Sequence, residues 1–246
     1  MGAPDLQSCT ILGVRVDDVT YDEALQCVER MLASAGIHQI ATVNVEFIME
    51  AQRNPDFGRV LATASLCVPD GIGVLWASRR QGTPLRARVA GVDLVEMLAA
   101  RAALRGWRVF FLGAAPGVAE RAATILEERY PGLVIAGCYA GSPSIAEENA
   151  IAERVRTTQP DVLFVAYGAP RQDLWIARNQ AQIGVPVALG VGGSFDFICG
   201  HAKRAPAWVQ RLGLEWLHRL LREPWRWRRQ LVLPLFALRV LMNRGQ

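Results

Sequence analysis

The chain has 246 residues, of which 51% are hydrophobic and 20% are charged. This composition supports a substantial buried core and excludes wholesale disorder, and the length allows one large α/β domain or one domain with a tail. Five scattered cysteines without a CxxC pair and three histidines without metal-ligand spacing argue against a disulfide framework and a zinc site, and they favour reduced thiols in the cytosol. No basic start followed by an apolar run opens the chain, so we expect no secretory signal.

The net charge of +4 is unevenly distributed. Residues 201–246 carry ten basic and two acidic residues, a net charge of +8, whereas residues 1–200 carry a net charge of −4. We therefore expect an α/β catalytic domain over residues 1–200 and a basic appendage rich in Trp and Leu over residues 201–246. Basic tails bind phosphate in nucleic acids, in lipid headgroups or in phosphorylated substrates.

Strand-like apolar runs alternate with helix-like stretches through the body. Strands are predicted over residues 10–16, 38–43, 66–68, 109–113, 133–139, 161–167 and 185–193. Helices are predicted after Thr20, over residues 45–53, 91–106, 116–130 and 144–157, and from Pro170. Several of these strands are apolar throughout, as expected when helices cover both faces of a sheet. The pattern predicts a mainly parallel, Rossmann-like sheet in an α/β/α sandwich, with ligands at the carboxyl ends of the strands.

The appendage has a different pattern. Large apolar residues recur at helical spacing from Trp208 to Leu220 with arginines between them, Pro224 ends that helix, and a second apolar run covers residues 231–242. The second run is too short to span a bilayer, which takes ~20 residues. Arg and Trp around an apolar face predict a segment that lies in the interface of an anionic leaflet. A helical pair packed onto the sheet explains the apolar face equally well but does not explain the charge.

Common nucleotide motifs are missing from the chain. It has no GxxxxGK[ST] loop and no Asp-x-Asp pair, and GIG at residues 71–73 fails the dinucleotide pattern because Trp76 replaces the third glycine. FLGAAPG (111–117) reads as a strand, a glycine turn and a helix, whose amides at Gly113 could cradle a phosphate. Asp70 follows the strand at 66–68 and precedes two glycines, a placement that suits a general base but equally suits a helix N-cap.

Seven blocks occur in order and together closely resemble the WecG/TagA/CpsF family of bacterial glycosyltransferases. They are TVNVEF (42–47), PDGIGV (69–74), RVAGVDL (88–94), FLGAAPG (111–117), YGAPRQDLW (167–175), VGGSFDFICGHAKRAP (191–206) and LGLEWLHRLLREPWRWRR (212–229). The resemblance implies an inverting, metal-independent transfer of a hexose from a UDP-sugar to a polyprenyl-pyrophosphate-linked sugar. The hexose would be N-acetylmannosamine, its uronic acid, glucose or a similar sugar.

The same resemblance implies roles for individual residues. It places the catalytic base on Asp70; the residues alone favour an N-cap there, and the other blocks shift the balance to catalysis. Substrate contacts are expected from Thr42, Asn44, Arg88, Gly113, Gln172, Gly192, Gly193 and Asp196. The alternatives remain helix capping for Thr42 and Asn44, a solvated surface arginine for Arg88, and a loop or capping aspartate for Asp196. Among the tail arginines, some are expected to contact lipid headgroups and others to grip a pyrophosphate: Arg204, Arg219, Arg222, Arg226 and Arg229.

The sequence thus predicts a glycosyltransferase of cell-surface or exported polysaccharide synthesis. We expect it on the cytoplasmic face of the bacterial inner membrane, bound peripherally to anionic lipid, with no cofactor and no metal. Nucleic acid is not expected as a partner because the arginines alternate with long apolar residues, and a homo-oligomer is compatible with the sequence. Two alternatives stay open: a non-catalytic peripheral membrane protein, and another nucleotide-sugar or dinucleotide enzyme.

Overall fold

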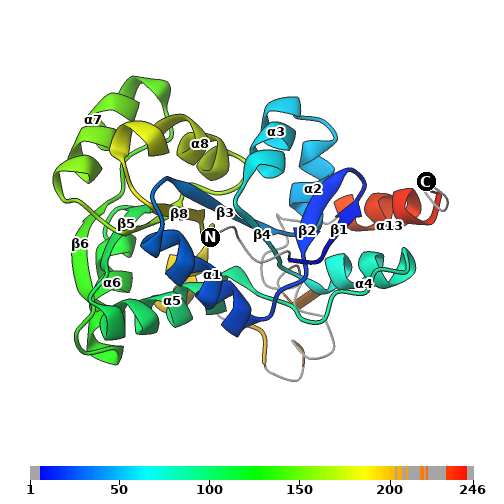
Figure 1. Ribbon diagram of the computed structural model, residues 1–246, viewed down its shortest axis with the longest axis horizontal. Helices are drawn as coiled ribbons and strands as arrows, with labels where there is room; N and C mark the ends of the chain where they lie inside the picture. Colours follow the sequence, from blue (N-terminus) through cyan, green and yellow to red (C-terminus); the bar gives the residue numbers. More distant parts are fainter. Residues whose placement is uncertain are drawn as a thin grey trace.

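A computed structural model describes residues 6–202, 204–206, 209, 217, 218, 220 and 231–242 and shows a parallel sheet between two layers of helices (Figure 1). The strand order is β4-β3-β8-β7-β5-β6, and every neighbouring pair is parallel. The strands are β3 (His38–Val43), β4 (Leu66–Pro69), β5 (Arg108–Gly113), β6 (Val134–Tyr139), β7 (Val162–Ala166) and β8 (Val187–Gly190). The predicted fold class is confirmed.

Helices follow most of these strands. They are α1 (Tyr21–Ala33), α2 (Val45–Ala51), α3 (Pro55–Thr63), α4 (Ile72–Arg80), α5 (Gly91–Arg105), α6 (Val118–Arg129), α7 (Ile145–Thr157), α8 (Arg171–Ile183), α9 (Ser194–Ile198) and α13 (Val232–Met242). Thr20 caps α1 as predicted, in a capping box with Glu23. The predicted elements omit α3, α4 and α9. Asn54 caps α3 by accepting a hydrogen bond from the Phe57 N–H at 3.2 Å.

The prediction of one strand over residues 10–16 is wrong. The segment forms an antiparallel hairpin, β1 (Ser8–Ile11) and β2 (Val14–Asp17), outside the parallel sheet. Leu12 and Gly13 both have positive φ, +48° and +79°, which is the backbone of a two-residue hairpin turn. The hairpin contacts the edge of the sheet, where Asp17 Oδ2 accepts a hydrogen bond from the Cys67 N–H of β4 at 2.7 Å.

Helices cover both faces of the sheet, and neighbouring strands in its middle are followed by helices on opposite faces. Helices α1, α5, α6 and α9 pack on the face that includes Ile40 and Val68, whereas α2, α3, α7 and α8 pack on the face that includes Ala41 and Leu163. The chain leaves β3 and β7 toward one face, through α2 and α8, and it leaves β8 and β5 toward the other face, through α9 and α6. Helix α4, which follows β4, joins the same core cluster as α2 before the chain continues to α5 on the opposite face. In open α/β sheets, ligands bind where neighbouring strands lead to opposite faces, beyond the carboxyl ends of the strands.

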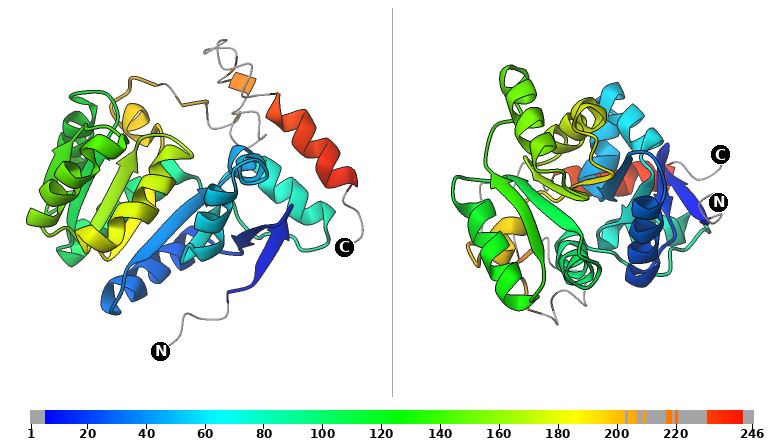
Figure 2. Two further views of the ribbon diagram at one scale, coloured as in Figure 1. Left: turned by 90° about the horizontal axis from the view of Figure 1, so that it is seen from above. Right: turned by 60° about the vertical axis from the view of Figure 1, so that its left-hand side comes forward.

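Helix α13 lies beside α4 and α2, at the β4 end of the sheet and far from β6 (Figures 1 and 2). Its buried residues Phe236 and Val240 join the core around β3 and β4, and the Phe236 ring lies 6.4 Å from the Trp76 ring, measured between centroids. Among the residues that the structure describes, no helix is both long enough and apolar enough to cross a bilayer.

Candidate active site

Asp70 lies directly after β4, half-buried, beside the end of β3. Its backbone N–H donates to the Val43 carbonyl oxygen at 2.8 Å, and its Oδ2 accepts a hydrogen bond from the Gly91 N–H at 3.3 Å. Because Gly91 is the first residue of α5, the carboxylate lies at the positive end of that helix dipole. The N-cap of α4 is Gly71, and among the described residues no side chain caps that helix, so capping α4 does not explain Asp70.

Thr42 meets Asp70 at the start of α5. A Cβ placed on Gly91 would lie 3.3 Å from Thr42 Cγ2 and 3.6 Å from Asp70 Oδ2. The buried Thr42 hydroxyl lies 3.5 Å from the Gly190 carbonyl oxygen, to which it donates across to β8. Asn44, two residues further, uses its Oδ1 to cap α2 by accepting from the Phe47 N–H at 3.0 Å. The structure therefore brings Asp70 and Thr42 together and gives the Asn44 oxygen a structural bond.

Gln172 connects two loops at the same edge of the sheet. Its side chain is 2% exposed, and its Oε1 accepts hydrogen bonds from the Gly168 N–H after β7 and the Gly192 N–H after β8, both at 3.0 Å. A Cβ on Gly190 would lie 2.4 Å from Gln172 Nε2, so this packing requires a glycine at position 190. The Gln172 oxygen thus organises the loops, and a contact with substrate hydroxyls would fall to its Nε2.

Asp173, next to Gln172, has a fully buried side chain. Within the described residues, neither of its carboxyl oxygens makes a hydrogen bond of good geometry. Burial raises the pKa of Asp173 to about 7, because desolvation penalises the charged form more than the nearby Gln172 side chain favours it. The sequence pattern did not single out this residue.

The glycines at the other predicted positions have different backbones. Gly113 has a φ of +99°, and a Cβ there would lie 2.8 Å from the Ala166 carbonyl carbon, so packing against β7 already requires glycine. Gly192 has a φ of +54°, and a Cβ there would meet no atom of the described part of the chain within 4 Å. Gly193 is the N-cap of α9, with an ordinary φ of −84°, and Asp196 lies half-buried in the first turn of that helix.

Arg88 and Arg204 lie beside an acidic residue that the sequence reasoning missed. Asp93 on α5 accepts hydrogen bonds on both carboxylate oxygens from the Arg204 guanidinium, with Nη2 to Oδ2 at 2.7 Å, and from the Tyr21 hydroxyl at 2.9 Å. Burial alone would raise the pKa of Asp93, but the hydrogen bonds and charge of Arg204, together with Tyr21 and the charge of Arg88, hold it below its usual value. Asp93 stands inside the RVAGVDL block, where its spacing looks like an ordinary first-turn helix acid. The remaining predicted arginines lie outside the described residues: Arg219, Arg222, Arg226 and Arg229.

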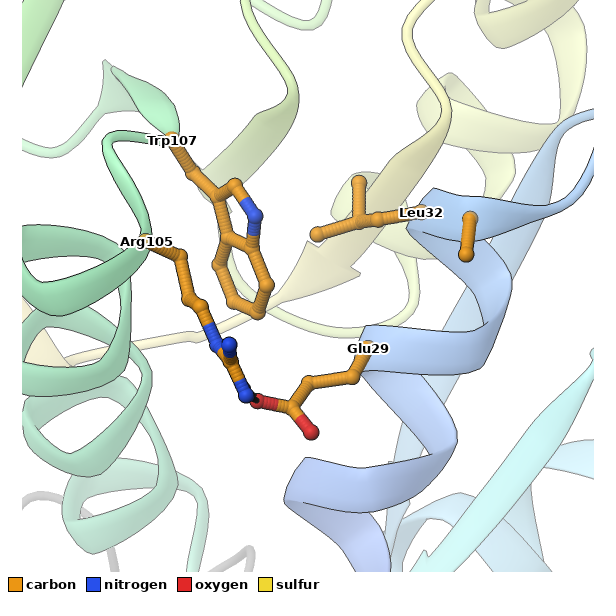
Figure 3. A pocket seen from close by; sticks show the side chains of 5 residues that line it. Glu29, Leu32, Arg105 and Trp107 are labelled. Atoms are coloured by element: carbon orange, nitrogen blue, oxygen red, sulfur yellow. Dashed lines mark hydrogen bonds and ion pairs between the residues drawn. The ribbon is translucent and has the colours of Figure 1, made fainter.

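A shallow cavity of about 260 Å³ lies elsewhere, between the C-terminal halves of α1 and α5 (Figure 3). Glu29 and Arg105 form an ion pair there, with Arg105 Nη2 to Glu29 Oε1 at 3.0 Å, and Trp107 precedes β5. The cavity is therefore at the amino ends of the strands, on the opposite edge from Asp70, and the candidate site is not built around it.

The sequence model of the glycosyl transferase WecG/TagA/CpsF family matches residues 9–246. A protein of Bacillus spizizenii is 40% identical over 204 residues, which cover 83% of this chain and 79% of the relative. A Bacillus subtilis protein is 38% identical over 202 residues, covering 82% and 78%, and a Staphylococcus aureus protein is 32% identical over 232 residues, covering 94% and 91%.

All three relatives are named N-acetylglucosaminyldiphosphoundecaprenol N-acetyl-beta-D-mannosaminyltransferase. The family match over nearly the whole chain, with relatives above 30% identity, confirms the resemblance drawn from the seven sequence blocks. It removes the alternative of a non-catalytic membrane protein. The chain belongs to the WecG/TagA/CpsF family and is a glycosyltransferase.

Proposed function

We propose that this enzyme transfers N-acetylmannosamine from a UDP-sugar to N-acetylglucosaminyl-diphosphoundecaprenol, with inversion at the anomeric carbon and without a metal ion. The choice of sugar and acceptor rests on the names of the relatives. The single observation that carries the mechanism is the position of Asp70, at the carboxyl end of β4, beside Thr42 and the N-terminus of α5.

In this mechanism Asp70 acts as the general base. The acceptor hydroxyl loses its proton to the Asp70 carboxylate while its oxygen forms a bond to the anomeric carbon from the face opposite to UDP. The bond between the anomeric carbon and the UDP oxygen breaks, and its electron pair leaves with UDP. We assign the turns at Gly113 and at Gly192 and Gly193 to the nucleotide, with Asp196 bonding the uracil or ribose. Thr42, Asn44, Arg88 and Gln172 Nε2 are assigned to sugar or phosphate groups.

The departing UDP carries negative charge that hydrogen-bond donors and cations must stabilise. We assign this role to helix N-termini and to the arginines of residues 201–246. Arg204 pairs with Asp93, so we assign the contact with the departing UDP to the other arginines of this segment.

Release of UDP tests the assignment directly. With a short-chain lipid-pyrophosphate N-acetylglucosamine as acceptor, UDP-N-acetylmannosamine should give the fastest release of UDP among UDP-hexoses, and the rate should persist in a chelator such as EDTA. Omitting the acceptor is the control for simple hydrolysis of the donor. The donor assignment is wrong if another UDP-sugar is turned over faster, and the metal-independent mechanism is wrong if EDTA stops the reaction.

We further propose that residues 201–246 associate with an anionic membrane on the cytoplasmic face, and that α13 and α4 supply part of the contact. Helix α13 and the residue before it expose a stripe of large apolar side chains at helical spacing: Leu231, Leu235, Leu238, Leu241 and Met242. Helix α4 beside it exposes Ile72 and Trp76. The two helices carry Arg79, Arg80 and Arg239 and no carboxylate, a charge pattern that complements anionic headgroups.

This surface adjoins the candidate site, because Ile72 begins α4 two residues after Asp70. An acceptor whose sugar is attached to a polyprenol must reach the carboxylate from a bilayer, so a lipid-facing surface next to Asp70 fits the proposed substrate. Exposed apolar patches of this kind mark interaction sites when they are contiguous.

Replacing Leu235 and Leu238 by Glu should weaken binding to anionic vesicles about tenfold or more, since each buried leucine contributes about 1.5–3 kcal/mol. The matched control is Leu104→Glu on α5, where the side chain is 82% exposed, against 53% for Leu238. Vesicle flotation measures binding, and UDP release with a short-chain acceptor should be unchanged in both variants. Equal binding of the double variant and the control would contradict the proposed surface.

A further inference from the structure

Three segments that are distant in the sequence meet at the Asp93 carboxylate. Tyr21, the first residue of α1, lies 72 residues away and donates its hydroxyl proton to Oδ2 at 2.9 Å. Arg204 lies 111 residues away and contacts both oxygens, an arrangement that fixes the guanidinium in two directions. The proposed transfer mechanism uses neither Asp93 nor Tyr21.

The Tyr21 hydroxyl extends this network to the start of α5. It accepts a hydrogen bond from the Ala90 N–H at 2.9 Å, and the next N–H in the chain, that of Gly91, donates to Asp70 Oδ2 at 3.3 Å. The first N–H groups of a helix have no partner within the helix, so Tyr21 and Asp70 share the donors at this end. Because Asp93 takes the hydroxyl proton of Tyr21, it orients the oxygen lone pairs of Tyr21 toward Ala90.

Arg204 extends the network in the other direction. The Ala202 N–H donates to the Asp196 carbonyl oxygen at 3.1 Å, so Arg204 follows immediately on the turn that ends α9 and precedes the rest of the C-terminal segment. The ion pair of Arg204 with Asp93 therefore holds the start of the C-terminal segment against the first turn of α5.

We propose that Asp93 is a positioning residue for the transfer reaction: it couples the start of the C-terminal segment to the N-terminal turn of α5, and through that turn to the Asp70 carboxylate. The inference rests on the proposed role of Asp70 as base. The Asp93 and Arg204 side chains are 34% and 28% exposed, and ion pairs accessible to solvent contribute little to stability. The effect of breaking the pair should therefore fall on turnover more than on folding.

Glu96 on the same helix provides a matched control. It forms an ion pair with Arg129 at 2.7 Å, and its side chain is 34% exposed, the same fraction as Asp93. Asp93→Asn and Tyr21→Phe should each lower kcat about tenfold, with KM for donor and acceptor changed less than about twofold, because misplacing the base raises the barrier without removing a ground-state contact. Glu96→Gln should leave kcat and KM within about twofold of the parent enzyme.

A double-mutant cycle tests the coupling itself. If Arg204 acts through Asp93, then Asp93→Asn combined with Arg204→Gln should lower kcat no further than Asp93→Asn alone. Thermal unfolding of every variant shows whether it folds. If Asp93→Asn does not fold, Tyr21→Phe, which removes one oxygen, provides the test instead. The inference is wrong if Asp93→Asn and Tyr21→Phe have the same kcat and KM as Glu96→Gln. It is also wrong if the losses in kcat from Asp93→Asn and Arg204→Gln add in the double variant. Asp70→Asn distinguishes failure of this inference from failure of the proposed function. If Asp70→Asn keeps full activity, Asp70 is not the base and the proposed function fails; if it loses activity while Asp93→Asn does not, only the positioning role of Asp93 fails.

Discussion

An Asp70→Asn enzyme should fold normally and lose at least about 100-fold in kcat, the usual contribution of a general base. The asparagine side chain has nearly the same size and keeps an oxygen that can accept the hydrogen bond from the Gly91 N–H, so the start of α5 should stay in place. It cannot accept the proton of the attacking hydroxyl. Release of UDP under saturating donor and acceptor measures kcat, and thermal unfolding measures folding.

Asp161→Asn is the matched control for this result. Asp161 also uses a carboxylate oxygen to accept one backbone N–H, that of Arg108 at 2.7 Å, but it lies before β7, at the amino edge of the sheet. Its kcat should equal that of the parent enzyme. Equal losses in both variants would show a general effect of removing a carboxylate, and an undiminished rate in Asp70→Asn would eliminate Asp70 as the base.

The sheet could be predicted because its central strands are buried on both faces. Continuous apolar runs such as those of β5, β7 and β8 have no other stable place than the middle of an α/β/α sandwich. The hairpin of β1 and β2 was not predicted because its turn places Leu12 at positive φ, a conformation that leucine rarely adopts. Helix α3 escaped because it follows α2 closely, although Asn54 and Pro55 carry its start signal.

Proximity between candidate site residues could be predicted where it depends on strand ends, and it could not be predicted where it depends on long-range partners. Asp70 and Thr42 end neighbouring parallel strands, so the sheet itself brings them together. Tyr21 and Asp93 gain their roles only from hydrogen bonds across 72 and 111 residues, which no local pattern encodes. Likewise, the buried position of Gln172 follows from two loop amides that converge on its oxygen, rather than from the YGAPRQDLW block alone.

Asp173 should make the stability of the protein fall as the pH rises. Its ordinary pKa of 3.8 is raised to about 7 in the folded protein by burial. Between these two values the folded protein holds a proton that the unfolded chain has released, so unfolding sheds a proton and becomes easier as the pH increases. The stabilisation is fully present below about pH 4, falls by at most about 1.4 kcal/mol per pH unit, and is lost above about pH 7.

Asp173→Asn isolates this contribution, because asparagine resembles the protonated carboxyl at every pH. Urea unfolding at pH 5 and pH 8 measures the free energy of unfolding of both proteins. From pH 5 to pH 8 the difference between the variant and the parent protein should shift in favour of the variant by about 2 kcal/mol or more, because the contributions of all other titrating groups cancel in the comparison. Parallel pH dependence of the two proteins would show that Asp173 is charged in the folded state. The result matters for the site because Asp173 lies next to Gln172, whose oxygen holds together the loops after β7 and β8. An ionised Asp173 would destabilise the start of α8, the helix that carries the Gln172 side chain and so positions those loops.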